Sequence, residues 1–129
     1  ADGVVIPERH ACGLTPAALK AAAGAAEHLP VCRVANLRQS LHQAREAGIW
    51  IAGLAADGDH DVAGVDWRVR CGVVIGGEGT GLRRLVRAAC DAVVSIPMAR
   101  HQVGSLNASV AAGLVLYEVC RQRAEGPRR

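Results

Sequence analysis

Residues 71–87 read CGVVIGGEGTGLRRLVR, and this stretch joins three patterns in direct succession. Residues 71–75 form a continuous apolar run, which is typical of a strand buried on both faces of a parallel sheet. Residues 76–81 contain four glycines, and residues 82–89 carry apolar side chains at helical spacing with three arginines opposite them. The stretch therefore predicts a strand, a tight loop and a helix, the unit from which α/β folds are built.

The same alternation continues on both sides of this unit. Expected strands lie at residues 4–6, 31–34, 49–52, 71–75 and 92–96, and expected helices at residues 15–26, 37–47, 82–89 and 105–123. Asn36 can cap the second of these helices, and Gly48 ends it. Residues 55–66 are expected to form a loop. The pattern predicts an α/β fold in one domain, residues 1–129, with a parallel sheet and helices on both faces.

The composition is that of a folded domain. Of the 129 residues, 50% are hydrophobic and 21% are charged, and no apolar run approaches the roughly 18 to 20 residues that a membrane span needs. The sequence does not open with a signal peptide, so we expect a cytoplasmic protein with no membrane partner. Residues 110–117 are apolar on every side of the expected last helix, and such a helix is best covered by a partner subunit.

Cysteine, histidine and acidic residues give no metal pattern. The five cysteines contain no CxxC pair, which argues against zinc or a disulfide framework. Asp57, Asp59 and Asp61 have the alternation of a calcium loop, but Val62 stands where that loop needs glycine. No metal is therefore expected. The formal net charge is +3, a mild excess carried almost entirely by arginine, which suits phosphate recognition.

Two polar loops follow expected strands. The first is residues 76–81, and the second runs from Ile96 to the expected start of the last helix at residues 105–109. Each has a plain structural interpretation, as a tight turn or as a helix cap, but together they lie at the carboxyl ends of two strands, where open α/β sheets bind ligands. A dinucleotide loop needs an acidic residue about 20 positions later, and that place is not acidic. Glu78 would also repel a pyrophosphate, so a cofactor that is cationic or lacks phosphates fits better.

These residues resemble a known family. GGEGTGLR at residues 76–83, and IPM at 96–98 followed by SLNASVAAG at 105–113, are similar to the second and third motifs of the SpoU/TrmH family of RNA ribose methyltransferases. IPERHA at residues 6–11, GLTP at 13–16 and GAAEHLPV at 24–31 are similar to the subgroup that methylates a guanosine in large-subunit ribosomal RNA. The resemblance covers nearly the whole chain.

The resemblance implies a C-terminal trefoil knot that holds S-adenosylmethionine, a homodimer, and RNA, ribosomal RNA in particular, as substrate. On matching positions, the implied cofactor-binding residues are Gly76, Gly77, Ile96, Met98 and Leu106, and the implied catalytic residues are Glu78, Ser105 and Asn107. Phosphate contacts are expected from four arginines, which are Arg9, Arg83, Arg84 and Arg87. The loop 99–104 is one residue longer than the family pattern, with Arg100 in place of a common glycine.

The family's first motif, an Asn and Gly followed by a catalytic Arg, would lie upstream of Val4. We therefore expect this chain to be the C-terminal part of such a domain, without its N-terminal strands. The leading interpretation is an RNA 2'-O-ribose methyltransferase. The alternatives are a non-catalytic fragment that binds the cofactor or forms the dimer, and, less favoured, a nucleotide-binding α/β domain.

Overall fold

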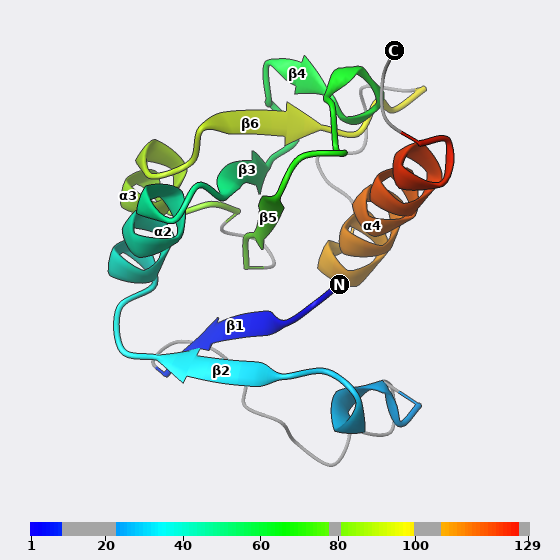
Figure 1. Ribbon diagram of the computed structural model, residues 1–129. Coiled ribbons are helices and arrows are strands. Elements are labelled where there is room, and N and C mark those ends of the chain that lie inside the picture. The colour runs from blue at the N-terminus through cyan, green and yellow to red at the C-terminus, as the bar shows by residue number, and fades with distance from the viewer. Residues whose placement is uncertain (9–22, 78–80, 100–106, 127–129) are drawn as a thin grey trace. The chain divides into compact units, whose positions relative to one another are not determined.

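The computed structural model describes residues 1–8, 23–77, 81–99 and 107–126 (Figure 1). They divide into two compact units, Ala1–Ser40 and Leu41–Arg129. The single-domain organisation expected from the sequence stays a prediction.

The first unit contains a two-stranded parallel sheet. β1 (Val4–Pro7) pairs with β2 (Val31–Val34). Both strands confirm the sequence prediction, and β2 has the expected bounds. The helix expected through residue 26 is wrong at its carboxyl end, because Ala23 and Gly24 have φ angles of 52° and 84° and only the short 3₁₀ helix η1 (Ala25–Glu27) follows. Its earlier part lies outside the described residues.

α2 (Leu37–Glu46) begins as predicted and ends one residue before the predicted end. The Asn36 side-chain oxygen accepts a hydrogen bond of 3.1 Å from the backbone N–H of Gln39, which satisfies one of the free donors of the first turn. Gly48 adopts a φ of 87° just beyond the helix, a conformation that glycine reaches without steric cost.

The second unit is built on four parallel strands. In spatial order they are β4 (His60–Asp61), β6 (Ala92–Ser95), β3 (Trp50–Leu54) and β5 (Cys71–Ile75). β4 and the 3₁₀ helix η2 (Val62–Gly64) fall within residues 55–66, so the prediction of an unbroken loop there is wrong. A two-residue strand is too short to produce a periodic pattern in the sequence.

Helices cover both faces of this sheet, as adjacent residues of β3 demonstrate. Ala52 is fully buried in a cluster with Val115 and Val119 of α4 (Ala108–Ala124). A Cβ on Gly53 would face the other side of the sheet, 2.7 Å from the Leu82 side chain and 2.9 Å from the Cys90 sulfur. These two residues precede and follow α3 (Arg84–Ala88) in the sequence. In Figure 1, α3 and α4 accordingly lie on opposite sides of β3. The predicted α/β class is confirmed.

Two expectations about the quoted stretch are wrong. β5 is the outermost described strand and pairs with β3 alone, so it is only partly covered and Ile75 is 37% exposed. α3 starts at Arg84, because Gly81 has a φ of 62° and Arg83 is extended. Five residues present no complete apolar face, and Leu85 is 53% exposed.

The core centres on Trp67, which is fully buried. Its ring N–H donates to the Val62 carbonyl at 2.8 Å, and its backbone N–H donates to the Gln122 side-chain oxygen at 2.8 Å. The Gln122 amide nitrogen donates in turn to the Val65 carbonyl at 2.9 Å. These bonds attach the second half of α4 to the segment that leads into β5. Among the described residues, no helix is long and apolar enough to cross a membrane.

Candidate functional site

The two predicted ligand loops begin at the same, carboxyl edge of the four-stranded sheet. Leu54, the last residue of β3, is paired with Ile75 of β5 on one side and with Val94 of β6 on the other. Gly76 follows Ile75 directly, and Ile96 follows Val94 by two residues. The register therefore brings the start of both loops to one edge, on either side of the end of β3.

The glycine-rich loop is folded tightly on itself. Gly77 and Gly81 form an isolated antiparallel bridge, in which the Gly81 N–H donates to the Gly77 carbonyl at 3.0 Å. A Cβ on Gly76 would lie 2.7 Å from the Leu82 backbone nitrogen and still closer to the Gly81 carbonyl group. Glycine is thus required at position 76 by the loop's own backbone, as the tight-turn interpretation of the sequence expects.

The second loop begins with half-buried apolar residues. Ile96 packs against the buried core cluster, and Met98 is also half-buried. At the far end, Asn107 is the N-cap of α4, and its side-chain oxygen accepts hydrogen bonds from the N–H groups of Ser109 at 2.9 Å and Val110 at 3.4 Å. The N-cap of α4 is therefore Asn107. The cap fixes the Asn107 side chain at the first turn of α4.

Part of the predicted site cannot be placed. Glu78, Ser105, Leu106 and Arg9 lie outside the described residues, so their assigned roles stay predictions. Across the described ranges, no group of three or more His, Cys, Asp or Glu side chains is arranged to hold a metal ion.

The three arginines after the glycine loop fall into two classes. Arg83 and Arg84 are exposed, and in the described parts of the chain their guanidinium groups have no hydrogen bond or ion pair. Arg87 instead pairs with Asp57 at 2.9 Å, across the space between α3 and the turn after β3. The hydrogen bond from Arg87 lowers the pKa of Asp57, and the same contact raises the pKa of Arg87. Both groups are therefore charged at neutral pH.

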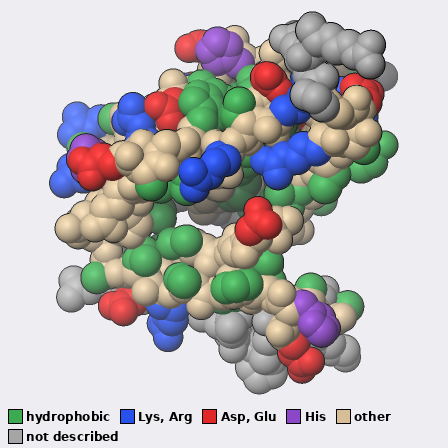
Figure 2. Space-filling model, viewed as in Figure 1, with side chains coloured by type: hydrophobic (Ala, Val, Ile, Leu, Met, Phe, Trp, Pro, Cys, Tyr) green, Lys and Arg blue, Asp and Glu red, His purple; other side chains and the backbone are tan. Residues whose placement is uncertain are grey.

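Charges of both signs are mixed on the visible surface. Figure 2 shows basic and acidic side chains interspersed over the second unit, without one broad basic field. This agrees with the net charge of only +3. Any attraction for a polyanion must therefore come from a few local arginines rather than from the overall charge.

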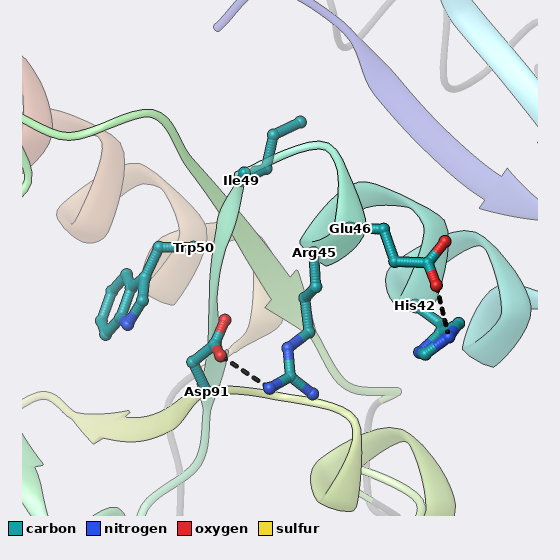
Figure 3. Close-up of a pocket in the computed structure, with 7 residues that line it drawn as sticks. His42, Arg45, Glu46, Ile49, Trp50 and Asp91 are labelled. Atoms are coloured by element: carbon teal, nitrogen blue, oxygen red, sulfur yellow. Dashed lines mark ion pairs between the residues drawn. The ribbon is translucent and has the colours of Figure 1, made fainter.

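An open hollow of about 480 Å³ lies at the opposite, amino-terminal edge of the sheet, and sequence reasoning missed it. Figure 3 shows Arg45 of α2 pointing toward Asp91, with which it pairs at 2.9 Å. The other oxygen of Asp91 accepts a hydrogen bond of 2.8 Å from the N–H of Ile51. Arg45 and Asp91 thus bond to each other and to the backbone. The side chains around the hollow therefore stabilise this edge of the sheet. No local pattern signals it, because Arg45 and Asp91 are far apart in sequence.

Comparisons with known proteins agree with this architecture. Residues 1–117 match the model of the SpoU rRNA Methylase family. YacO of Bacillus subtilis, which is assigned to the TrmH family of tRNA/rRNA methyltransferases, is 50% identical over 123 residues, or 95% of this chain and 49% of YacO. An uncharacterized tRNA/rRNA methyltransferase of Mycolicibacterium vanbaalenii is 53% identical over 121 residues, or 94% of this chain and 38% of that protein. The chain thus spans half or less of the length of these relatives.

Solved structures show the same fold. The SpoU methyltransferase AviRb from Streptomyces viridochromogenes, in complex with the cofactor AdoMet, superposes with a TM-score of 0.87 at 35% identity, over 96% of this chain and 51% of AviRb. An RNA 2'-O ribose methyltransferase superposes with a TM-score of 0.83 at 26% identity, over 96% of this chain and 47% of that one. On the family match and the shared fold together, the chain belongs to the SpoU rRNA Methylase family.

Proposed function

We propose that this chain is the cofactor-binding part of an S-adenosylmethionine-dependent RNA methyltransferase, which methylates a ribose 2'-hydroxyl of a guanosine in ribosomal RNA. The observation that carries the proposal is that two family motifs, at residues 76–83 and 96–98, begin at one edge of the sheet, on either side of the end of β3. AviRb binds AdoMet, and the second superposed enzyme is named for 2'-O ribose methylation. A ribosome-directed enzyme would act in the cytoplasm.

The described residues fit this cofactor. Gly77 exposes backbone at the carboxyl edge, and Ile96 and Met98 offer half-buried apolar side chains in the segment that begins at the same edge. An adenosine needs both kinds of contact, because its base has apolar faces and a polar edge. Gly76, Gly77, Ile96, Met98 and Leu106 would hold S-adenosylmethionine, which supplies a methyl group on a positively charged sulfur. The trefoil knot implied by the family resemblance belongs to this proposal.

The polar residues would orient the ribose. A ribose hydroxyl must point its oxygen at the methyl group and give up its proton, and general base assistance is typically worth about 10² to 10⁴ in rate. Ser105 and Asn107 can form hydrogen bonds to the hydroxyl, with Glu78 beside them. Of these three residues, Asn107 is the one that the structure describes, and its role as the N-cap of α4 holds its side chain in a fixed position. Arg9, Arg83 and Arg84 would contact RNA phosphates.

A homodimer is part of the same proposal. One stripe of α4, which contains Val115 and Val119, is buried against the sheet. A second stripe, at helical spacing, contains Val110, Leu114 and Tyr117, which are 51%, 44% and 68% exposed. Exposed apolar residues in a row are typical of a surface that a partner covers. Leu114→Glu should therefore convert a dimer to a monomer in sedimentation.

Binding and methyl transfer test the proposal. Calorimetry of the full chain should show saturable binding of S-adenosylmethionine and S-adenosylhomocysteine, but not of a dinucleotide such as NAD. Methyl transfer to ribosomal RNA, by a protein that also supplies the family's first motif, should leave one phosphodiester resistant to alkali, because a methylated 2'-oxygen cannot attack it. Tight dinucleotide binding without a response to either sulfur compound would refute the proposal.

Asn107 offers a matched pair of variants for the catalytic role. Asn107→Asp keeps an oxygen for the cap but removes the amide, whereas Asn107→Ala removes both. We expect both variants to lose methyl transfer, and only Asn107→Ala to lose stability. Full transfer by Asn107→Asp would exclude a catalytic role for the amide nitrogen.

A further inference from the structure

The turn that follows β3 lies between the two predicted cofactor loops. β3 is flanked by β5 and β6 in the sheet, so residues 55–58 leave the carboxyl edge between residues 76–81 and the segment that starts at Ile96. The Gly58 N–H donates to the Ala55 carbonyl at 3.1 Å, which closes the turn. A movement of this turn would therefore shift the start of both loops.

The turn is attached to β6 by backbone groups. The Ala55 N–H donates to the Val94 carbonyl at 3.0 Å. A Cβ on Gly58 would lie 2.5 Å from the Val94 carbonyl carbon and 2.9 Å from the Ser95 nitrogen, so the turn rests directly on the end of this strand. Ile96 is the next residue, and its position is thus linked to that of the turn.

The other side of the turn is attached to α3 by one ion pair. Asp57 and Arg87 approach to 2.9 Å, with side-chain exposures of 76% and 37%. The loop 76–81 leads into α3, and Leu82 packs on Gly53 at the base of the same turn. The pair therefore connects the glycine loop, through α3, to the turn and to β6. The lowered pKa of Asp57 keeps the carboxylate charged at neutral pH.

We propose that Asp57 and Arg87 are positioning residues, whose ion pair sets the spacing of the two cofactor loops, and that Arg87 is not a phosphate ligand. The inference rests on the proposed function. An RNA phosphate that bound Arg87 would have to displace Asp57, whereas Arg83 and Arg84 have no competing partner among the described residues. Two of the three arginines are therefore assigned to RNA and the third to the cofactor site.

Cofactor binding gives the first test. S-adenosylhomocysteine would be titrated into the full chain and into Asp57→Asn, Arg87→Gln and the double charge swap Asp57→Arg with Arg87→Asp. Each single variant should bind about two- to fivefold more weakly, a modest loss that suits one solvent-exposed ion pair. The swap should recover most of the loss, because it restores the attraction.

Glu125→Gln is the matched control. It removes an exposed carboxylate that pairs with Arg121 at 2.6 Å near the end of α4. This variant should change melting temperature about as much as Asp57→Asn and leave the affinity for S-adenosylhomocysteine unchanged. A purely structural role for Asp57 would make the two variants alike in both measurements.

RNA binding gives the second test. The salt dependence of binding to a ribosomal RNA fragment should fall by about 0.7 to 0.9 in log–log slope for Arg83→Ala or Arg84→Ala, and should not change for Arg87→Ala. If the unchanged chain does not bind S-adenosylhomocysteine, the proposed function and this inference both fall. If it binds, and Asp57→Asn binds equally well or Arg87→Ala lowers the slope, the inference alone is wrong.

Discussion

At the amino-terminal edge of the four-stranded sheet, the Asp91 carboxylate holds Arg45 and the Ile51 N–H, whereas at the carboxyl edge the loop 76–81 is closed by its own backbone. Side chains from distant segments brace the first edge. At the second edge, close backbone approaches that only glycine permits shape the loop, and a single exposed ion pair, Asp57 with Arg87, joins the turn after β3 to α3. Because side chains stabilise the amino-terminal edge, the side chains and exposed backbone of the carboxyl edge are available for ligands. Variants at the two edges should therefore give different results.

The largest effect is expected in the buried core rather than at either edge. Trp67 is fully buried, and its ring and backbone N–H groups both form hydrogen bonds. Trp67→Ala should lower the free energy of unfolding by about 3 to 5 kcal/mol, measured by chemical denaturation. Trp50→Phe, at the half-buried ring that meets Trp67 edge to face, should cost less than about 1.5 kcal/mol. Similar losses for the two variants would place the centre of the core elsewhere.

Gly76→Ala should disrupt the carboxyl edge. Its methyl group would overlap the Gly81 and Leu82 backbone, which can move only if the loop opens. We expect a loss of about 1 to 3 kcal/mol in stability, as in overpacked cores, and weaker binding of S-adenosylmethionine in calorimetry. Gly113→Ala is the control, because a Cβ there meets nothing within 4 Å, and in a helix it should stabilise by about 0.5 to 1 kcal/mol. Unchanged binding by Gly76→Ala would show that the loop shape is not needed for the cofactor.

Asp91→Asn, at the other edge, should lower stability without weakening cofactor binding. It weakens two hydrogen bonds to a charged group, which are commonly worth about 1.5 to 3 kcal/mol, although partial exposure places this site at the lower end. Stability in urea should fall, while the affinity for S-adenosylmethionine stays within about twofold. Arg45→Gln should produce part of the same loss and add little to Asp91→Asn. A large fall in cofactor affinity would mean that the two edges are coupled.

The sequence predicts what local patterns encode. Asn36 and Gly48 mark the ends of α2, residues 31–34 mark β2, and the strand-end rule places the two loops at one edge. Contacts between distant parts of the chain have no such signal, as the pairing of Trp67 with Gln122, 55 positions later, illustrates. The choice of Asn107 over a serine as the α4 cap depends on where the helix starts, and sequence patterns locate such boundaries only within a few residues.

The candidate site divides in the same way. The sequence predicts that Gly76 belongs to the cofactor site. The need for glycine there comes from the Gly81 carbonyl group, which would collide with a Cβ and which only the folded loop brings close. Arg87 has the same sequence pattern as Arg83 and Arg84, since all three are charged residues opposite an apolar stripe. Only the arrangement of the turn after β3 reveals that Asp57, 30 residues earlier, pairs with it.

The smallest expected effect concerns the second half of α4, and it depends on pH. Hydrogen bonds from Arg121 and Gln122 lower the pKa of Glu118 from 4.5 to about 2. Because the folded-state value is lowered, the ionised carboxylate contributes stability above pH 4.5, and this contribution is lost as the pH falls toward 2. Glu118→Gln should therefore lower the melting temperature by about 2 °C at pH 7 and converge with the unchanged chain near pH 2. Glu125→Gln removes another carboxylate from the same Arg121 and should leave the dependence on Glu118 in place. A difference between Glu118→Gln and the unchanged chain that persists at pH 2 would show that the packing of the side chain, rather than its charge, stabilises the helix.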